Sequence, residues 1–473
     1  MIWSIAWKNI WRNRKRSLVV IIAVTIGIIA GVLLVGIMEG WTTQRLHDAV
    51  YNEVSHLQIH NNGYLRNEEI GLTVDQAGQV IQSIDSLSEI SGWVQRTKLV
   101  AMAGTPWANT GVVVYGVDPG KEKQITEIYR KIVPGGGAYL DSVNRGGILI
   151  GDKAADLLKL KQYNLTDTVL GNLAKVIPED VVSQLEPLRN ERFKSYKEFT
   201  GALKKELGPR VLDKYGLLIT RQALDYRVRN KIQITLSDLN GNPVQGIFRV
   251  CGIYKTTNAG FDQAAVFVNA RELADLYGGN EVLTHEIAIL CKNMDDADAV
   301  KLKLNRNAGG NVVRTWRELA PDAAIMHDFI YLYYFVFVGI IMLALAFGII
   351  NTMMMAVLER TKELGMLMAI GMNHGKIFRM IMLETVFLTF AGALAGMLLG
   401  WSIALVLGKT GIHFAGWGEG FEAIGFAARV YPVVKPGFIL FTTLLVIFTA
   451  LVASVWPARK ALKLIPVEAL RTE

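Results

Sequence analysis

Cysteine is nearly absent from this chain of 473 residues, which contains only Cys251 and Cys291. Two cysteines are too few for a disulfide scaffold or for a metal site built on thiolates. Each lies in a short apolar run that favours a β-strand, F-R-V-C-G-I-Y and I-A-I-L-C-K. This setting fits two buried free thiols about as well as one disulfide, so both alternatives stay open from the sequence.

Nucleotide-binding, catalytic and metal-binding motifs are also missing. None of the dipeptides Gly120-Lys121, Gly375-Lys376 and Gly408-Lys409 has both the upstream glycine and the hydroxyl residue of a phosphate-binding loop. No G-x-S-x-G or H-E-x-x-H arrangement occurs. His56 and His60 lie in a segment that predicts a strand, where their spacing separates them by about 13 Å. We therefore expect no catalytic residues, no ATPase module, no metal and no cofactor bound by this chain.

Charged residues are missing from four long stretches, although they make up 19% of the chain. A helix needs about 20 apolar residues to cross a bilayer, and each stretch is long enough. The first stretch is too long for a cleaved secretory signal and has no small-x-small cleavage site, which predicts an uncleaved anchor. The charge-free stretches are residues 18–38, 329–358, 385–408 and 436–458. The predicted transmembrane segments have the same bounds, except that the first extends to residue 41.

Lysine and arginine are unevenly distributed among the segments that flank these spans. They are frequent in residues 1–17, 359–384 and 459–473, and few in residues 409–435. Short basic flanks stay on the cytoplasmic side of a membrane. We therefore expect both termini and the loop 359–384 inside, with residues 42–328 and 409–435 outside. The net charge of +8 follows this topology, which disfavours nucleic-acid binding.

The first 17 residues form a candidate amphipathic helix. Trp3, Trp7 and Trp11 fall on one helical face, and most of the basic residues fall on the other. The pattern predicts an interfacial helix on the inner leaflet, with its indole rings at headgroup depth. The alternative is a basic topology signal that happens to contain tryptophans.

Residues 42–328 have an ordinary globular composition and are numerous enough for a core of their own. Strand-like runs alternate with helical segments such as 295–304, which predicts an α+β domain. Asn240-Gly241 lies between two such runs and predicts a type I′ hairpin turn. The cluster at 135–137 predicts a flexible glycine loop. The strand-like runs are 56–60, 110–117, 231–236, 248–254 and 265–269.

Residues 161–229 differ from the rest of this domain. Their segment 179–207 is charged, rich in helix formers and poor in strand signals, and Pro178 and Pro187 can start helices. We interpret this region as a helical insertion. The fold class predicted for the whole chain is an α-helical membrane protein with four transmembrane helices and a large α+β extracytoplasmic domain between helices 1 and 2.

Glycine recurs at intervals of four residues along two spans. Gly392, Gly396 and Gly400 share one face of the third span, and Gly27 and Gly31 repeat the spacing in the first. Such faces let helix backbones approach closely in lipid, so we predict helix packing there. The alternative is the general abundance of glycine in membrane helices.

Strongly polar side chains are rare in the second and third spans. Asn351 and Glu384 are the only ones within them or at their edges, and we expect Glu384 to reach water at the cytoplasmic edge. An ion pathway needs several such groups facing one another. We therefore do not expect a proton or ion transporter.

The loop after the second span begins E-R-T-K-E-L-G-M-L-M-A-I-G, residues 359–371. Glu359 can pair with Lys362 three residues later, and Leu364, Leu367 and Met368 can pack on the bilayer or on a partner. Gly365 and Gly371 allow a bend or the close approach of another surface. By its chemistry alone, this segment is a charged turn between two spans.

Taken in order, these features resemble the ABC-transporter permeases of the MacB/FtsX/LolC–LolE superfamily. The resemblance covers the chain except for about 161–229, and its specific motifs are the loop 359–371 and the tail P-A-R-K-A-L-K-L-I-P-V-E-A-L-R at 457–471. Three further segments look most like the lipoprotein-releasing LolC/LolE branch. They are V-S-H-L-Q-I-H-N-N-G-Y (54–64), G-V-D-P-G (116–120) and L-A-F-G-I-I-N-T-M-M-M-A-V-L-E-R (345–360).

The resemblance implies a non-enzymatic permease of the bacterial inner membrane with a MacB-like periplasmic domain. Such permeases pair with a second copy or a paralogue, and they bind two copies of a cytoplasmic ATPase that itself holds ATP and Mg. ATP-driven motion then reaches the outer domain to release or export lipoproteins, with a periplasmic lipoprotein or chaperone as a further partner. The residues implied in ATPase coupling are Glu359, Arg360, Lys362, Glu363, Gly365 and Gly371 in the loop and Arg459, Lys460 and Glu468 in the tail.

Two other functions are consistent with the same resemblance. An FtsX-like regulator uses the same motion to activate a periplasmic cell-wall hydrolase. A MacB-type permease exports peptides or drugs, although MacB carries its ATPase on the same chain and we expect none here.

The topology can be tested with reporter fusions at positions 200 and 365. Because the basic flanks place the loop 359–384 inside and residues 42–328 outside, the two fusions should report opposite compartments. A periplasm-dependent reporter should be active only at position 200, and a cytoplasm-dependent one only at 365. Activity of both fusions in the same compartment would contradict the topology.

Overall fold

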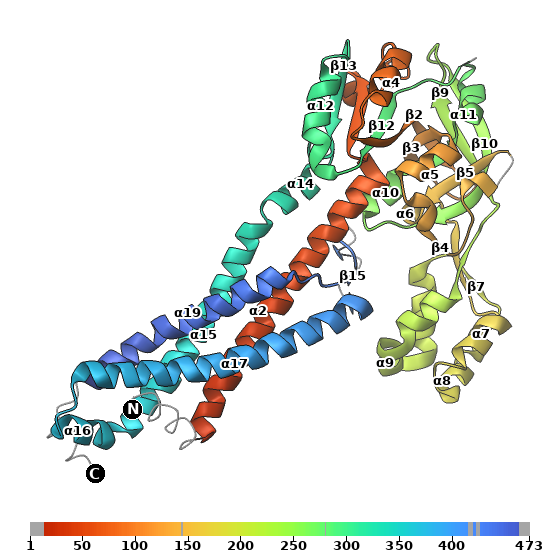
Figure 1. Ribbon diagram of the computed structural model, residues 1–473. Coiled ribbons are helices and arrows are strands. Elements are labelled where there is room, and N and C mark those ends of the chain that lie inside the picture. Colours follow the sequence, from red (N-terminus) through yellow and green to blue (C-terminus); the bar gives the residue numbers. More distant parts are fainter. Residues whose placement is uncertain (1–13, 143–144, 280, 415–419, 422–425, 463–473) are drawn as a thin grey trace. The chain divides into compact units, whose positions relative to one another are not determined.

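The computed structural model describes residues 14–142, 145–279, 281–414, 420–421 and 426–462 (Figure 1). The interfacial helix expected in residues 1–17 lies almost entirely outside them. The chain divides into two compact units, a membrane unit and an α/β unit. The membrane unit comprises Met1–Gln44, Ile325–Gly418 and Ala428–Glu473, and the α/β unit comprises Arg45–Ala324 and Glu419–Ala427.

The membrane unit is built from four long apolar helices. They are α2 (Arg14–Asp48), α15 (Ile330–Glu359), α17 (His374–Thr410) and α19 (Pro436–Leu462). Each is long and apolar enough to cross a membrane. A short helix, α16 (Thr361–Ala369), lies between α15 and α17, and the strands β14 (Ile412–His413) and β15 (Arg429–Val430) pair beyond α17. Helix α17 starts at His374, so much of the segment 359–384 is helical and not loop.

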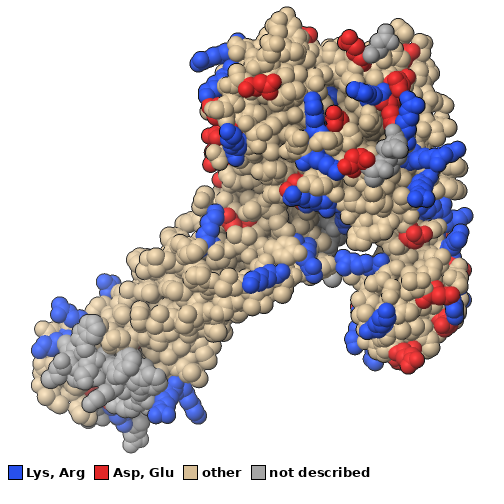
Figure 2. Space-filling model, turned by 45° about the vertical axis from the view of Figure 1, so that its right-hand side comes forward, with Lys and Arg blue, Asp and Glu red and all other residues tan. Residues whose placement is uncertain are grey.

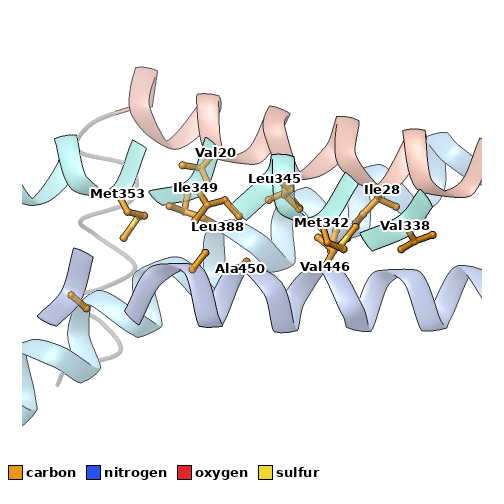
Figure 3. Packing of buried hydrophobic residues seen from close by; sticks show 14 of the residues in the cluster. Val20, Ile28, Val338, Met342, Leu345, Ile349, Met353, Leu388, Val446 and Ala450 are labelled. Carbon is orange, nitrogen blue, oxygen red and sulfur yellow. The ribbon is translucent and has the colours of Figure 1, made fainter. Parts of the chain in front are cut away.

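The four helices share one apolar core. Val24 and Ile28 of α2 are fully buried, and Leu388 and Val446 from α17 and α19 belong to the same cluster (Figure 3). Large apolar side chains also cover the outside, for example Phe347 and Leu398, which are exposed. On the face that Figure 2 shows, much of the described surface of this unit carries no charged side chains. The free energy of such a surface is favourable in contact with lipid and unfavourable in contact with water.

The α/β unit contains a ten-stranded sheet in the order β13-β1-β12-β2-β3-β11-β5-β10-β4, with β9 paired to β10 and β2. The pairs β3–β11 and β5–β10 are parallel, and the other pairs are antiparallel. The strands are β1 (Leu57–Asn61), β2 (Ile90–Gly104), β3 (Asn109–Val117), β4 (Ile132–Gly137), β5 (Gly147–Gly151), β9 (Lys231–Ser237), β10 (Pro243–Tyr254), β11 (Ala265–Asn269), β12 (Glu286–Cys291) and β13 (Asn311–Thr315).

Short helices connect these strands and cover the sheet. The helices of the α/β body are α3 (Tyr64–Asn67), α4 (Ala77–Asp85), α5 (Pro119–Ile125), α6 (Asp152–Leu157), α10 (Ala259–Ala264), α11 (Ala270–Tyr277), α12 (Ala297–Asn305) and α13 (Trp316–Leu319), and α14 (Pro321–Asp328) leads out of it. Several begin with a side-chain cap. Asp118, for example, accepts hydrogen bonds from the amides of Gly120 and Lys121 at the start of α5.

Two turn predictions were wrong. The glycines at 135–137 form the end of strand β4, because only glycine lets this strand lie so close to β10: a Cβ on Gly137 would be 2.2 Å from the carbonyl oxygen of Cys251. The hairpin between β9 and β10 is confirmed, but its turn is not type I′. Asn240 is not left-handed, and the Asp238 carboxylate orders the turn by accepting from the amides of Asn240 and Asn242 at 2.8 Å.

The insertion is a small subdomain with a core of its own. Its helices are α7 (Asp167–Leu173), α8 (Glu179–Ser183) and α9 (Tyr196–Ala223), and its strands β6 (Lys161–Asn164), β7 (Arg192–Phe193) and β8 (Leu224–Tyr226) form a three-stranded sheet. Leu165, Leu173, Phe199, Leu203 and Ile219 are buried together. Residues Lys161 and Tyr226 are register partners, so the insertion leaves and re-enters the α/β body at one place.

Both cysteines are free and buried, which resolves the alternatives left open by the sequence. Cys251 lies in β10 and Cys291 ends β12. Burial raises the pKa of the Cys251 thiol to about 12 and that of Cys291 to about 11. Both therefore act as small apolar side chains and not as nucleophiles at neutral pH.

An ion cluster is buried where β2 passes from one part of the sheet to the other. Arg96 donates to Glu122 at 2.7 Å and to Glu286 at 2.6 Å, and none of the three is more than 2% exposed. Burial by itself raises the pKa of Glu286, but the nearby Arg96 outweighs it and holds that pKa below its usual value. Removal of one charge would leave the others buried and unpaired, so the cluster fixes how β2, β12 and α5 fit together.

Candidate functional site

Helix α16 is delimited by backbone breaks on both sides. Arg360 leaves the helical conformation at the end of α15, with φ −107° and ψ 19°. After α16, Gly371 adopts φ +92°, a conformation that favours glycine, and Asn373 caps α17 by accepting from the amide of Gly375 at 2.9 Å. The segment therefore reverses the chain between two long helices while staying helical itself.

The two faces of α16 differ. Leu364 and Gly365 are buried, and Leu367 and Met368 pack against the core of the membrane unit. Lys362, Glu363, Met366 and Ile370 are exposed, as is Glu359 at the end of α15. An exposed face that mixes charges with large apolar side chains is typical of a contact surface for another protein.

An ion pair fixes the start of α16 to α17. The Arg360 guanidinium donates from one nitrogen to both carboxylate oxygens of Glu384, each at 3.1 Å. The two side chains are only 12% and 6% exposed. The expectation that Glu384 reaches water was therefore wrong, because Arg360 holds it inside the unit. The pair lines a pocket of about 300 Å³ between α15, α16 and α17, and Glu363 is another of its lining residues.

The predicted tail site is described only in part. Arg459 and Lys460 lie in the last turn of α19 and are exposed, where cations are favoured by the helix dipole. The Lys460 ammonium lies 5.8 Å from the ring centroid of Trp456. Glu468 lies outside the described residues.

The glycines of α17 face α2. A Cβ on Gly392 would be 2.8 Å from the carbonyl oxygen of Ile21, and one on Gly396 would be 2.9 Å from Cβ of Ile28. Both distances are too short for any residue with a Cβ to replace glycine without a shift of the helices. Gly400 is less tightly packed, because its Cβ would be 3.6 Å from the nearest atom.

The glycines of α2 face the other two helices. A Cβ on Gly27 would be 3.3 Å from Leu345 of α15, and one on Gly31 would be 3.1 Å from Thr442 of α19. Helix α2 therefore contacts all three of the other long helices. A displacement of α17 cannot leave α2 unaffected, since packed helices have no free space between them.

Helix α2 continues beyond the membrane unit, because the boundary between the units falls between Gln44 and Arg45. Within the α/β unit, Arg45 donates to Glu53 at 2.6 Å and to Asp322 at 2.8 Å. Glu53 follows α2 along the chain, and Asp322 belongs to α14, which leads to α15. Arg45 thus links the segment that follows α2 to helix α14, which precedes α15.

No group of three or more His, Cys, Asp and Glu residues suitable for a metal ion occurs in the described part of the chain. Within the α/β unit, His56 accepts a hydrogen bond from the amide of Cys291 at 2.9 Å. His60 shares one with Gln58 at 2.9 Å, and burial lowers its pKa. These histidines hold strands in place.

The sequence reasoning missed the Arg360–Glu384 and Arg45–Asp322 pairs. The first joins residues 24 positions apart and the second joins residues 277 positions apart. The only signal for the first was an acidic residue beside an apolar span with an arginine at the end of the preceding span. The sequence contains no signal for the Arg45–Asp322 pair, since nothing in it brings positions 45 and 322 together.

Residues 335–466 match the family model of the FtsX-like permease C-terminal region. That range holds most of α15 and all of α16, α17 and α19. The macrolide export ATP-binding/permease protein MacB of Chlorobaculum tepidum is 37% identical over 127 residues, which is 27% of this chain and 17% of that protein. The chain thus matches less than a fifth of the length of this relative.

Two further comparisons cover more of the chain. The lipoprotein-releasing system transmembrane protein LolC of Neisseria meningitidis is 23% identical over 415 residues, covering 81% of this chain and 96% of that protein. The extracellular domain of the noncanonic ABC-type transporter YknZ from Gram-positive bacteria aligns with 55% of this chain and 99% of its own, at 11% identity and a TM-score of 0.28.

The contact between α17 and α2 can be tested with two alanine variants one helical turn apart. Gly396→Ala forces the backbones apart, so we expect it to lower the free energy of unfolding by about 1–3 kcal/mol. Gly400→Ala adds the same methyl group where there is space and should be neutral or slightly stabilising. The thermal unfolding midpoint of the full chain in detergent measures both. Equal midpoints would show that the α17 face is not closely packed.

Proposed function

We propose that this chain transmits the motion of a separate cytoplasmic ABC ATPase to its α/β unit, because residues 335–466 match the FtsX-like permease family model and MacB and LolC are among its relatives. The ATPase binds ATP and Mg, and this chain supplies the membrane path. The observation that carries the proposal is α16, a helix with an exposed mixed face that is tied by Arg360 to Glu384 of α17. It lies inside the region that matches the permease family.

The proposed path has three steps. The ATPase docks on the exposed face of α16, with Lys362 and Glu363 at the contact and Arg459 and Lys460 as a second contact. The buried ion pair passes a displacement of α16 to α17. The glycine contacts pass it from α17 to α2, which continues into the α/β unit.

The proposed topology places both termini and α16 in the cytoplasm and the α/β unit outside. The basic flanks support this arrangement. We also propose that the chain works beside a second permease, either an identical copy or a paralogue.

The proposed substrate class is a lipoprotein that is anchored in the membrane and released from it. The support is the LolC relative, whose name describes lipoprotein release and with which this chain aligns over 96% of that protein's length. The insertion is the proposed site for recognition of an external partner or substrate, because it has its own core and completes no part of the ten-stranded sheet.

Export of a small molecule is the second candidate function. It is favoured by the higher local identity of 37% to MacB, whose name describes macrolide export. A lipoprotein substrate and a macrolide can be distinguished in a transport assay with membrane vesicles. Only the former is released from a vesicle without crossing the bilayer.

The docking surface can be tested by charge reversal at Glu363. We expect Glu363→Lys to lower the stimulated ATP turnover of the ATPase that co-purifies with the chain by at least ~10-fold, because like charges then meet in the contact surface. Lys409→Glu is the matched control, since it reverses an exposed charge at the other end of α17. Both variants should insert into the membrane normally. Unchanged turnover in Glu363→Lys would leave α16 as a simple turn.

A further inference from the structure

A large apolar groove lies at the end of the membrane unit where α15 and α19 begin. Its volume is about 740 Å³, which is within the range of small-molecule sites. The walls come from α2, α15 and α19 and include Tyr334, Val338, Met342, Phe438, Phe441 and Leu445. All of these side chains are apolar or aromatic, so the occupant must be apolar along most of its length.

The rim of the groove carries one charge of each sign. The Lys435 ammonium lies 2.7 Å from a carboxylate oxygen of Glu39, and the Tyr334 hydroxyl donates to the other oxygen of that carboxylate. The Lys435 side chain is 69% exposed, whereas Glu39 is 16% exposed. The Lys435 ammonium can therefore contact a second group while it keeps its ion pair with Glu39. The ring of Tyr331, another lining residue, is exposed in the way that is typical of aromatic side chains at the level of lipid headgroups.

We propose that this groove binds an acyl chain of a zwitterionic aminophospholipid from the surrounding membrane, with the headgroup at Glu39 and Lys435. The phosphate faces the Lys435 ammonium, and the amine faces the Glu39 carboxylate. A headgroup with both charges complements the two charges of the rim, whereas a purely anionic headgroup is repelled by the Glu39 carboxylate. The surroundings of the groove in a membrane are hydrocarbon, which supplies this occupant at high concentration.

The proposal goes beyond the permease function and does not rest on it. It assigns a site for a resident lipid on the outside of one chain, whatever substrate the assembled transporter handles. A bound lipid would also stabilise the packing of α2, α15 and α19 by mass action, because it binds only the folded unit.

Two glycines of α15 allow a direct test of the groove. Gly339 lines the groove, and a Cβ on it would have no atom within 4 Å. The Cβ of a leucine at this position therefore meets no neighbouring atom, and we expect the rest of its side chain to occupy space in the groove. Gly348 lies on the same helix and has equally open space, but it does not line the groove. Gly348→Leu is the matched control.

The test uses the full chain, purified in detergent, stripped of lipid and titrated with phosphatidylethanolamine. Native mass spectrometry counts the lipids retained per chain. We expect the wild type and Gly348→Leu to bind with equal affinity, and Gly339→Leu to bind at least ~10-fold more weakly. A midpoint of unfolding equal to that of Gly348→Leu shows that Gly339→Leu is folded. Equal lipid binding by the two variants would overturn the proposal.

The headgroup assignment is tested with phosphatidylglycerol, which has the phosphate but no amine. The wild type should prefer phosphatidylethanolamine. Glu39→Gln removes the carboxylate that recognises the amine, so the preference should reverse toward phosphatidylglycerol. A wild type that prefers phosphatidylglycerol, or a preference unchanged in Glu39→Gln, contradicts the assignment.

Two other occupants would be revealed by the same spectra. If a second copy of the chain covers the groove, Gly339→Leu will abolish a dimer and leave lipid binding unchanged. If the groove is made for a lipoprotein anchor, a diacylated lipopeptide will displace phosphatidylethanolamine at an equal concentration. Either result would overturn the proposal of a resident phospholipid.

Discussion

The close contact of α17 with α2 at Gly392 and Gly396 is the constraint on which the membrane unit depends. Between apolar helices in lipid there is no hydrophobic driving force, so association rests on close packing over small residues. A side chain at either glycine would meet the backbone or a Cβ of α2. Because Gly27 and Gly31 of α2 also lie close to Leu345 of α15 and Thr442 of α19, this one helix contacts all three of the others.

In the proposed path, α2 is the helix that links the membrane unit to the α/β unit. Helix α2 has 35 residues and is therefore about 52 Å long, whereas a bilayer core is about 30 Å thick. The excess carries α2 into the α/β unit, where Arg45 bonds to both Glu53 and Asp322. At the other end, Arg360 ties α16 to Glu384. Three ion pairs, Arg45–Glu53, Arg45–Asp322 and Arg360–Glu384, and the glycine contacts of α2 and α17 are the elements of the proposed path.

Patterns that repeat along the chain could be predicted from the sequence, and contacts between distant positions could not. The apolar runs gave the four helices, and the glycine spacing indicated a packing face without identifying α2 as its partner. The burial of Glu384 was missed because its proximity to a span edge looked like access to water. The Arg96 cluster gave no signal, since Glu122 and Glu286 lie far from it in the chain. In the insertion, β7 and β8 are too short, at two and three residues, to show a strand period.

The central claim is that ATP-driven motion at α16 reaches the α/β unit through α2. Hydrogen exchange, measured on the chain together with its co-purifying ATPase, tests it most directly. A non-hydrolysable ATP analogue should change the protection of Thr361–Ala369 and also that of Ala49–Val54, the helical turn that follows α2. A change confined to Thr361–Ala369 would show that α16 binds the ATPase without transmitting its motion, and would contradict the account.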